Sequence, residues 1–180
     1  MKNAPSPIMT ETNLLPSFCT ARVLVLGVGN MMFSDDGFGP AVIEYLQDRY
    51  QIPEDIYVMD TGTGVRKVLF TLALGETHPQ EVVIVDAVDW GQTVGQVIEI
   101  TADQLPASKI DDFSLHQVPT SNLLHDLQNI CAVKVSVIAC DVGEIPQEIG
   151  PGLTPKIQLA VAAAAQQIAS KFGLEGKRHA

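Results

Sequence analysis

The sequence predicts an α/β protein with a mostly parallel sheet of about five strands, one of them antiparallel or at an edge, and helices on both faces. Apolar runs alternate with stretches of helical spacing in the order β-α-β-α-β-β-α-β-α, which is typical of this fold class. The first apolar run, residues 23–28, is almost continuous, as in a buried parallel strand. With 180 residues, 46% of them hydrophobic, the chain fits one domain with one core.

The predicted strands are short apolar runs bounded by turn residues, and they cover residues 22–28, 56–59, 81–85, 95–100 and 133–138. The run at 95–100 follows the preceding strand without room for a helix. Because a parallel crossover needs about a dozen residues or more, this run is expected to be the antiparallel or edge strand.

The predicted helices have apolar residues three and four positions apart, and they cover residues 38–50, 65–72, 123–130 and 155–172. Either Thr120 or Ser121 can cap the third helix. Thr154 is expected to cap the last helix, which Pro155 starts and Gly173 ends.

Composition excludes several classes of protein. Lys and Arg number 11 against 21 Asp and Glu, so the net charge is −10, which disfavours binding to nucleic acid or to an anionic membrane surface. No stretch reaches the roughly 18 apolar residues of a membrane helix, and residues 1–20 contain no apolar core of a signal peptide. We therefore expect a cytoplasmic protein with a flexible N-terminal extension (1–20), a single domain (21–173) and a tail (174–180).

Acidic side chains follow three of the predicted strands. Asp36 comes after the first strand, Asp60 after the second and Asp86 after the third. Because ligands in open α/β sheets bind beyond the carboxyl ends of the strands, these acids are expected at the binding edge. Any single Asp can merely shape a turn or cap a helix. Taken as a set, however, neighbouring like charges need a proton or a cation, so we favour a cation site.

His116 is the histidine best placed to join these acids. His78 enters a strand at the opposite edge, His179 is in the tail, and His125 lies inside a predicted helix. His116 precedes that helix and can face the carboxyl edge. A set of two carboxylates and one imidazole suits Ni, Zn or Mn.

Competing catalytic signatures are missing from the sequence. It contains no HExxH, GxSxG or P-loop motif. Gly27 and Gly29 begin like a dinucleotide fingerprint, but Met32 stands where the third glycine belongs. The three cysteines form no CxxC pair, which disfavours a disulfide scaffold or a thiolate zinc site. Cys140 can be a nucleophile, although a buried small residue is the favoured interpretation.

Several ordered motifs make the sequence resemble the nickel–iron hydrogenase maturation endopeptidases over about residues 22–172. The first motif is Gly27-Val-Gly-Asn-Met-Met-Phe-Ser-Asp-Asp-Gly-Phe-Gly39. The others are Asp60-Thr-Gly-Thr63, Val83-Ile-Val-Asp-Ala87, Ser114-Leu-His-Gln117 and Gly152-Leu-Thr-Pro155. The resemblance implies a three-layer α/β/α sandwich, in agreement with the element order. It is greatest to the branch that serves cofactor-reducing, deazaflavin-type hydrogenases.

The resemblance also implies a function. The family removes a C-terminal extension from the large-subunit precursor after nickel insertion, and the precursor's nickel serves as the recognition handle. Asp36, Asp86 and His116 match the family's metal-contact positions, so they would touch the nickel of the substrate, and no permanent cofactor is expected. Relatives commonly carry Glu at the first of these positions. Asp60 would be a base or an orienting group, or it would only shape the turn at 62–64.

The sequence leaves two other functions open. One is a metal-sensing chaperone that grips the precursor without cutting it. The other is an esterase similar to peptidyl-tRNA hydrolases, which also begin with a strand and a glycine–asparagine turn, but the net charge of −10 opposes it. The partner expected from the resemblance is the hydrogenase large-subunit precursor, with no nucleic acid and no membrane, and the free protein is expected to be a monomer.

Overall fold

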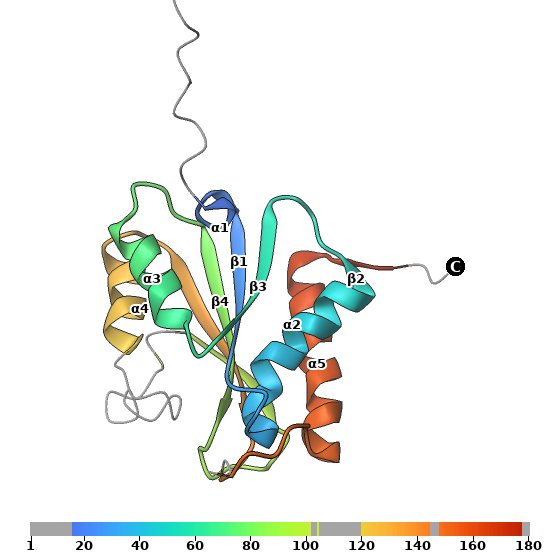
Figure 1. The fold of residues 1–180 in the computed structure, drawn as a ribbon. Helices are drawn as coiled ribbons and strands as arrows, with labels where there is room; N and C mark the ends of the chain where they lie inside the picture. The colour runs from blue at the N-terminus through green and yellow to red at the C-terminus, as the bar shows by residue number, and fades with distance from the viewer. Residues whose placement is uncertain (1–15, 102–103, 105–119, 145–147, 178–180) are drawn as a thin grey trace, which may run out of the picture.

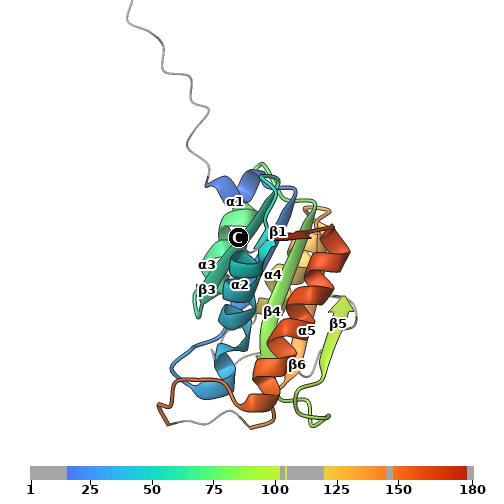
Figure 2. The same cartoon turned by 90° about the vertical axis from the view of Figure 1, so that its right-hand side faces the viewer.

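The computed structural model describes residues 16–101, 104, 120–144 and 148–177. Its main element is a five-stranded sheet in the order β3-β1-β4-β6-β5. These strands are β1 (Val23–Val28), β3 (Ile56–Gly62), β4 (Glu81–Val88), β5 (Val97–Thr101) and β6 (Lys134–Asp141). All neighbours pair in parallel except β5, which runs antiparallel to β6 at the edge of the sheet (Figure 2). The predicted mostly parallel sheet with one antiparallel edge strand is confirmed.

Helices cover both faces of the sheet, which confirms the three-layer architecture. On one face lie α2 (Phe38–Arg49) and α5 (Pro155–Phe172), and on the other lie α3 (Val65–Leu74) and α4 (Thr120–Asn129) (Figure 1). Alternate residues of β1 enter opposite cores: Val23 and Val25 pack with α2 and α5, and Leu24 and Leu26 pack with α3 and α4. This alternation explains why β1 is apolar throughout.

The strand order creates a topological switch point between β1 and β4. From β1 the chain passes through α2 to β3 on one side, and then through α3 to β4 on the other side of β1. The two connections leave in opposite directions, and in open α/β sheets ligands bind beyond the carboxyl ends of the strands at such a point. Both α2 and α5 begin at this end of the sheet, which is the lower end in Figure 1.

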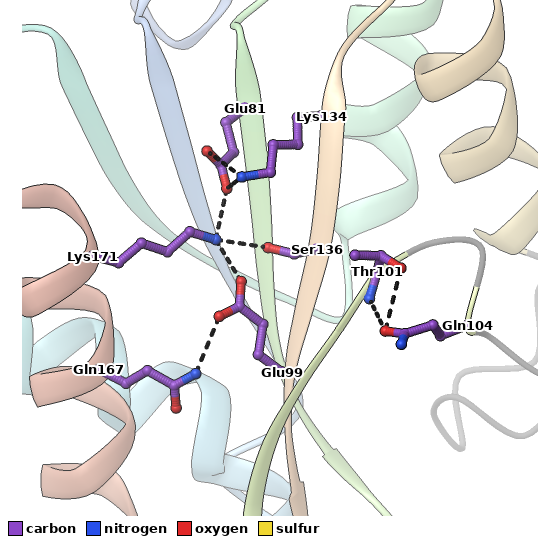
Figure 3. A network of polar contacts seen from close by, with 8 residues as sticks. All are labelled: Glu81, Glu99, Thr101, Gln104, Lys134, Ser136, Gln167 and Lys171. Carbon is purple, nitrogen blue, oxygen red and sulfur yellow. Dashed lines mark hydrogen bonds and ion pairs between the residues drawn. The ribbon is translucent and has the colours of Figure 1, made fainter.

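A partly buried ion-pair network joins α5 to three strands. The Nζ atom of Lys171 lies 2.6 Å from an Oε atom of Glu81 on β4 and 2.5 Å from an Oε atom of Glu99 on β5. It also donates to the Ser136 hydroxyl on β6 at 3.3 Å. The amide of Gln167 donates to the second oxygen of Glu99 (Figure 3). The network therefore links the antiparallel edge strand β5 to helix α5.

The packed structure extends beyond both of the domain boundaries expected from the sequence. A short helix, α1 (Ser17–Thr20), places Cys19 in the core beside α3 and α4. At the other end, β7 (Glu175–Gly176) pairs antiparallel with β2 (Tyr50–Gln51), and Leu174 is buried. Elements of two to four residues are too short to show a hydrophobic period, so the sequence pattern does not reveal them. Within the described ranges, no helix is both long and apolar enough to cross a membrane.

Candidate functional site

Two glycines let the chain fold closely over the switch point. Gly29 has a φ of 132°, and a β-carbon there would lie 1.9 Å from the carbonyl oxygen of Asp36. A β-carbon on Gly39 would lie 2.2 Å from the carbonyl oxygen of Val28 and 2.4 Å from that of Val85. Only glycine permits these approaches. As a result, the start of α2 and the 3-10 turn before it, η1 (Ser34–Gly37), lie directly against the ends of β1 and β4.

Asp36, on η1, is one of the two acids at this point. Its side chain is only 1% exposed, and its Oδ2 accepts a hydrogen bond from the backbone N–H of Asn30 at 2.7 Å. Asn30 belongs to the turn that follows β1, and its Oδ1 accepts from the N–H of Met32 at 3.0 Å. The turn residues therefore hold the Asp36 carboxylate from the β1 side.

Asp86 is the second acid, and it comes from β4. It lies within this strand, which continues to Val88, rather than after the strand end expected near residue 85. It is 4% exposed, and its Oδ1 accepts the N–H of Ala87 at 2.9 Å. β4 is the neighbour of β1 in the sheet and also contacts η1, the turn that carries Asp36.

The two acids are electrostatically coupled. Burial raises the pKa of Asp86 well above its usual range, and the nearby charge of Asp36 raises it further. The hydrogen bond from the N–H of Ala87 lowers this pKa, but it does not cancel the increase. Two buried carboxylates whose charges interact favour the uptake of a proton or the binding of a cation. The structure thus places Asp36 and Asp86 near enough for their charges to interact, and their role as metal contacts stays a prediction.

Asp60 has a different environment. It pairs in register with Gly27 inside β3, which runs on to Gly62, and its side chain is exposed. Its Oδ1 accepts the N–H of Gly62 at 2.7 Å, and the neighbouring Thr61 donates its hydroxyl to the carbonyl of Gly27 at 2.7 Å. This is the turn-shaping contact that the sequence left open as an alternative. The role of Asp60 as a base stays a prediction.

The predicted third ligand, His116, lies outside the described residues. Within the ranges that the structure describes, no three His, Cys, Asp or Glu side chains gather closely enough to hold a metal ion. The described part of the site is therefore the pair of Asp36 and Asp86, with the imidazole still a prediction.

Asp35 is a site residue that sequence reasoning missed. It neighbours Asp36 on η1, but its carboxylate turns the other way and accepts two hydrogen bonds from Thr154, from the N–H at 2.6 Å and from the hydroxyl at 2.9 Å. Thr154 occupies the cap position of α5 as predicted, yet its side chain makes no capping bond because it is engaged with Asp35. Two successive acids on a short turn, with a Thr-Pro helix start elsewhere in the chain, are the only signal of this contact.

Cys140 does not have the properties of a nucleophile. It is fully buried, and burial, followed by the charges of Asp141 and Asp35, raises its pKa to about 12. A thiol with such a pKa is almost entirely protonated at neutral pH. Asp141 itself accepts the N–H groups of Gln92 and Gly143 at 2.7 and 3.0 Å, which orders the loops around the site.

Comparison with known families gives one match that covers most of the domain. The family model of the hydrogenase maturation proteases, HycI, matches residues 40–171. The match begins within α2 and ends near the last turn of α5.

Individual relatives agree with this family model. The chain is 33% identical over 159 residues to the coenzyme F420 hydrogenase subunit delta of Methanothermobacter thermautotrophicus, covering 86% of this chain and 96% of that protein. It is 29% identical over 150 residues to the hydrogenase 2 maturation protease of Escherichia coli, covering 82% and 88%. Among solved structures, the hydrogenase maturating endopeptidase HybD from E. coli superposes with a TM-score of 0.68 at 26% identity, covering 86% and 96% of the two chains.

Proposed function

The chain belongs to the hydrogenase maturation protease family, and we propose that it removes the C-terminal extension of a nickel–iron hydrogenase large-subunit precursor after nickel has been inserted. Family membership makes it a hydrolase and an endopeptidase. The similarity to a subunit named for a coenzyme F420 hydrogenase supports a precursor of that deazaflavin-reducing type as the substrate.

The observation that carries this proposal is the buried pair of Asp36 and Asp86 at the switch point. Two buried carboxylates whose charges interact are costly when both are ionised, and a divalent cation offsets that cost. In this proposal the cation is the nickel of the precursor, so it is part of the substrate. His116 would supply the third contact, and a site with three ligands leaves positions open for the thiolates of the precursor.

The reaction is amide hydrolysis beside the docked metal. Asp36 and Asp86 orient the precursor so that its scissile peptide lies next to the site. A water molecule adds its oxygen to the carbonyl carbon, the C–N bond breaks, and the leaving amine takes a proton. Asp60, at the exposed end of β3, is the candidate group to accept the proton of the water or to orient it.

The test uses the nickel-loaded precursor and measures its intact mass before and after incubation. We expect the wild-type protein to remove a short tail, and Asp36→Asn and Asp86→Asn to remove none. Asp89→Asn is the matched control, because Asp89 lies three residues after Asp86 but its side chain is exposed. Full cleavage by both of the first two variants would refute the assignment of the acid pair.

The same measurement separates the protease from a chaperone. A chaperone would form a stable complex with the precursor and leave its mass unchanged, whereas a protease shortens the precursor and releases it. A precursor that stays intact and bound by the wild-type protein would replace the proposed activity with the chaperone function.

A further inference from the structure

Three large apolar side chains are exposed beside the acid pair: Met31 is 55% exposed, Met32 48% and Ile149 70%. We call them the apolar rim. Single exposed apolar residues are common on protein surfaces, but a cluster at the mouth of a site is a sign of a binding surface. Because the rim adjoins the place where the proposed function positions the precursor, its occupant can be inferred.

Backbone hydrogen bonds hold the two parts of the rim together. The N–H of Gly150 donates to the carbonyl of Met32 at 2.9 Å, and the N–H of Ser34 donates to the carbonyl of Gly150 at 2.8 Å. Phe33 and Gly150 form a parallel bridge, and Met32 and Ile149 directly precede these two residues. These backbone bonds therefore join the two segments that carry the rim, which lie more than a hundred residues apart in the chain.

The rim also contacts the turn that carries the first acid. A β-carbon placed on Gly37, the residue after Asp36, would lie 3.1 Å from the Cα of Met31 and 3.7 Å from a methyl group of Leu153. Asn30, the residue before Met31, donates its N–H to Asp36. The loop after β1 therefore has two roles. Its backbone donates a hydrogen bond to Asp36, and the side chains of its two methionines are exposed to solvent.

We propose that the apolar rim binds an apolar segment of the precursor next to its nickel ligands. This inference rests on the proposed function, because it takes the acid pair as the place where the precursor's nickel docks. Methionine is flexible and polarisable, so Met31 and Met32 can adapt to the shape of an apolar peptide.

The test compares two double variants in cleavage of the nickel-loaded precursor. In the first, Met32→Ser and Ile149→Ser remove two rim side chains, while Met31 stays because it lies against Gly37, the residue after Asp36. In the second, Leu159→Ser and Ile130→Ser remove side chains that are more exposed than Ile149 but lie on α5 and directly after α4. We expect the first to raise KM about tenfold with kcat within about twofold, and the second to change neither.

The possible outcomes separate the two proposals. If the wild-type protein cleaves and both double variants have its KM, the rim inference is wrong while the proposed function stands. If the wild-type protein does not cleave, the proposed function fails. The rim inference is then tested by comparing the affinities of the two double variants for the intact precursor. A protein that neither cleaves nor binds the precursor would overturn both. Equal melting temperatures of the two double variants exclude loss of folding as the cause.

Discussion

Asp35 and Thr154 lie 119 residues apart in the chain and are joined by two hydrogen bonds, at 2.6 Å from the backbone N–H and at 2.9 Å from the hydroxyl. Asp35 is buried on the same 3-10 turn as Asp36. The start of α5 therefore fixes the direction of the turn that carries the first acid. In the proposed function Asp35 acts through Asp36, as a positioning residue.

This contact predicts different results for two substitutions at one position. Thr154→Val removes the hydroxyl and leaves one oxygen of a buried carboxylate without its donor, so we expect a loss of about 2 kcal/mol in the free energy of unfolding and a lower kcat. Thr154→Ser keeps both hydrogen-bond donors, so its free energy of unfolding and its kcat should stay near those of the wild type. Urea denaturation and cleavage kinetics check this. A valine variant that cleaves like the wild type would show that Asp36 needs no support from α5.

The network around Lys171 predicts a stability that depends on pH. Burial alone would raise the pKa of Glu99, but the hydrogen bond and charge of Lys171 lower it overall. Burial alone would lower the pKa of Lys171, but its bonds to Glu81 and Glu99 raise it. The stabilisation by Glu99 is therefore present above its unfolded pKa of about 4.3 and is lost as the pH falls through its lower folded value. The stabilisation by Lys171 is present below about pH 10.4 and is lost only above it.

We expect Lys171→Met to lower the free energy of unfolding by about 2 kcal/mol at pH 7, because it leaves two half-buried carboxylates facing each other. The difference from the wild type should shrink at pH 3, because the Glu99 carboxylate takes up a proton as the pH falls through its pKa. Lys134→Met is the matched control, since Lys134 is 3.4 Å from Glu81 but 64% exposed and should contribute about 0 to 1 kcal/mol. A loss of equal size at pH 3 and pH 7 would mean that packing of the lysine stem, and not its charge, stabilises the edge strand.

Gly39 provides a test of how the site is built. Its position allows α2 to begin against the carbonyl groups of Val28 and Val85, and an added methyl group would overlap both. We expect Gly39→Ala to cost about 3 kcal/mol and to reduce cleavage, because the helix and the acid turn before it must shift. Gly150→Ala should cost less than about 1 kcal/mol, since nothing lies within 4 Å of the added carbon. Thermal unfolding of the two variants gives the comparison.

The sheet and its covering helices could be predicted because their signals are long and repeat. Each buried strand is an apolar run, and each helix has a stripe with a period of three to four residues. The placement of Asp36 and Asp86 at one edge followed from a rule of topology that needs only the strand order. Those parts of the prediction depend on the average behaviour of many residues.

The contacts of single side chains could not be predicted in the same way. Asp35 and Asp36 are chemically identical and adjacent, yet one bonds to the start of α5 and the other to the turn after β1. Asp60 follows the same sequence pattern as Asp86 but is exposed and bonds to its own turn. Which acid is buried depends on how closely the glycine-rich loop folds over the sheet. The composition of the sequence and the spacing of its residues do not predict how close this approach is.

Cys140 tests whether the chemistry belongs to the acids or to a thiol near the same edge. With a pKa raised to about 12, it should have about one part in ten thousand as thiolate at pH 8, and burial further hinders a reagent. We expect iodoacetamide to label Cys131, which is half-buried, faster than Cys140 in the native protein. Cys140→Ala should keep cleavage of the precursor and lose about 1 kcal/mol of stability, because only a small buried group is removed. Rapid labelling of Cys140 together with an inactive alanine variant would instead place a nucleophilic thiol in the reaction.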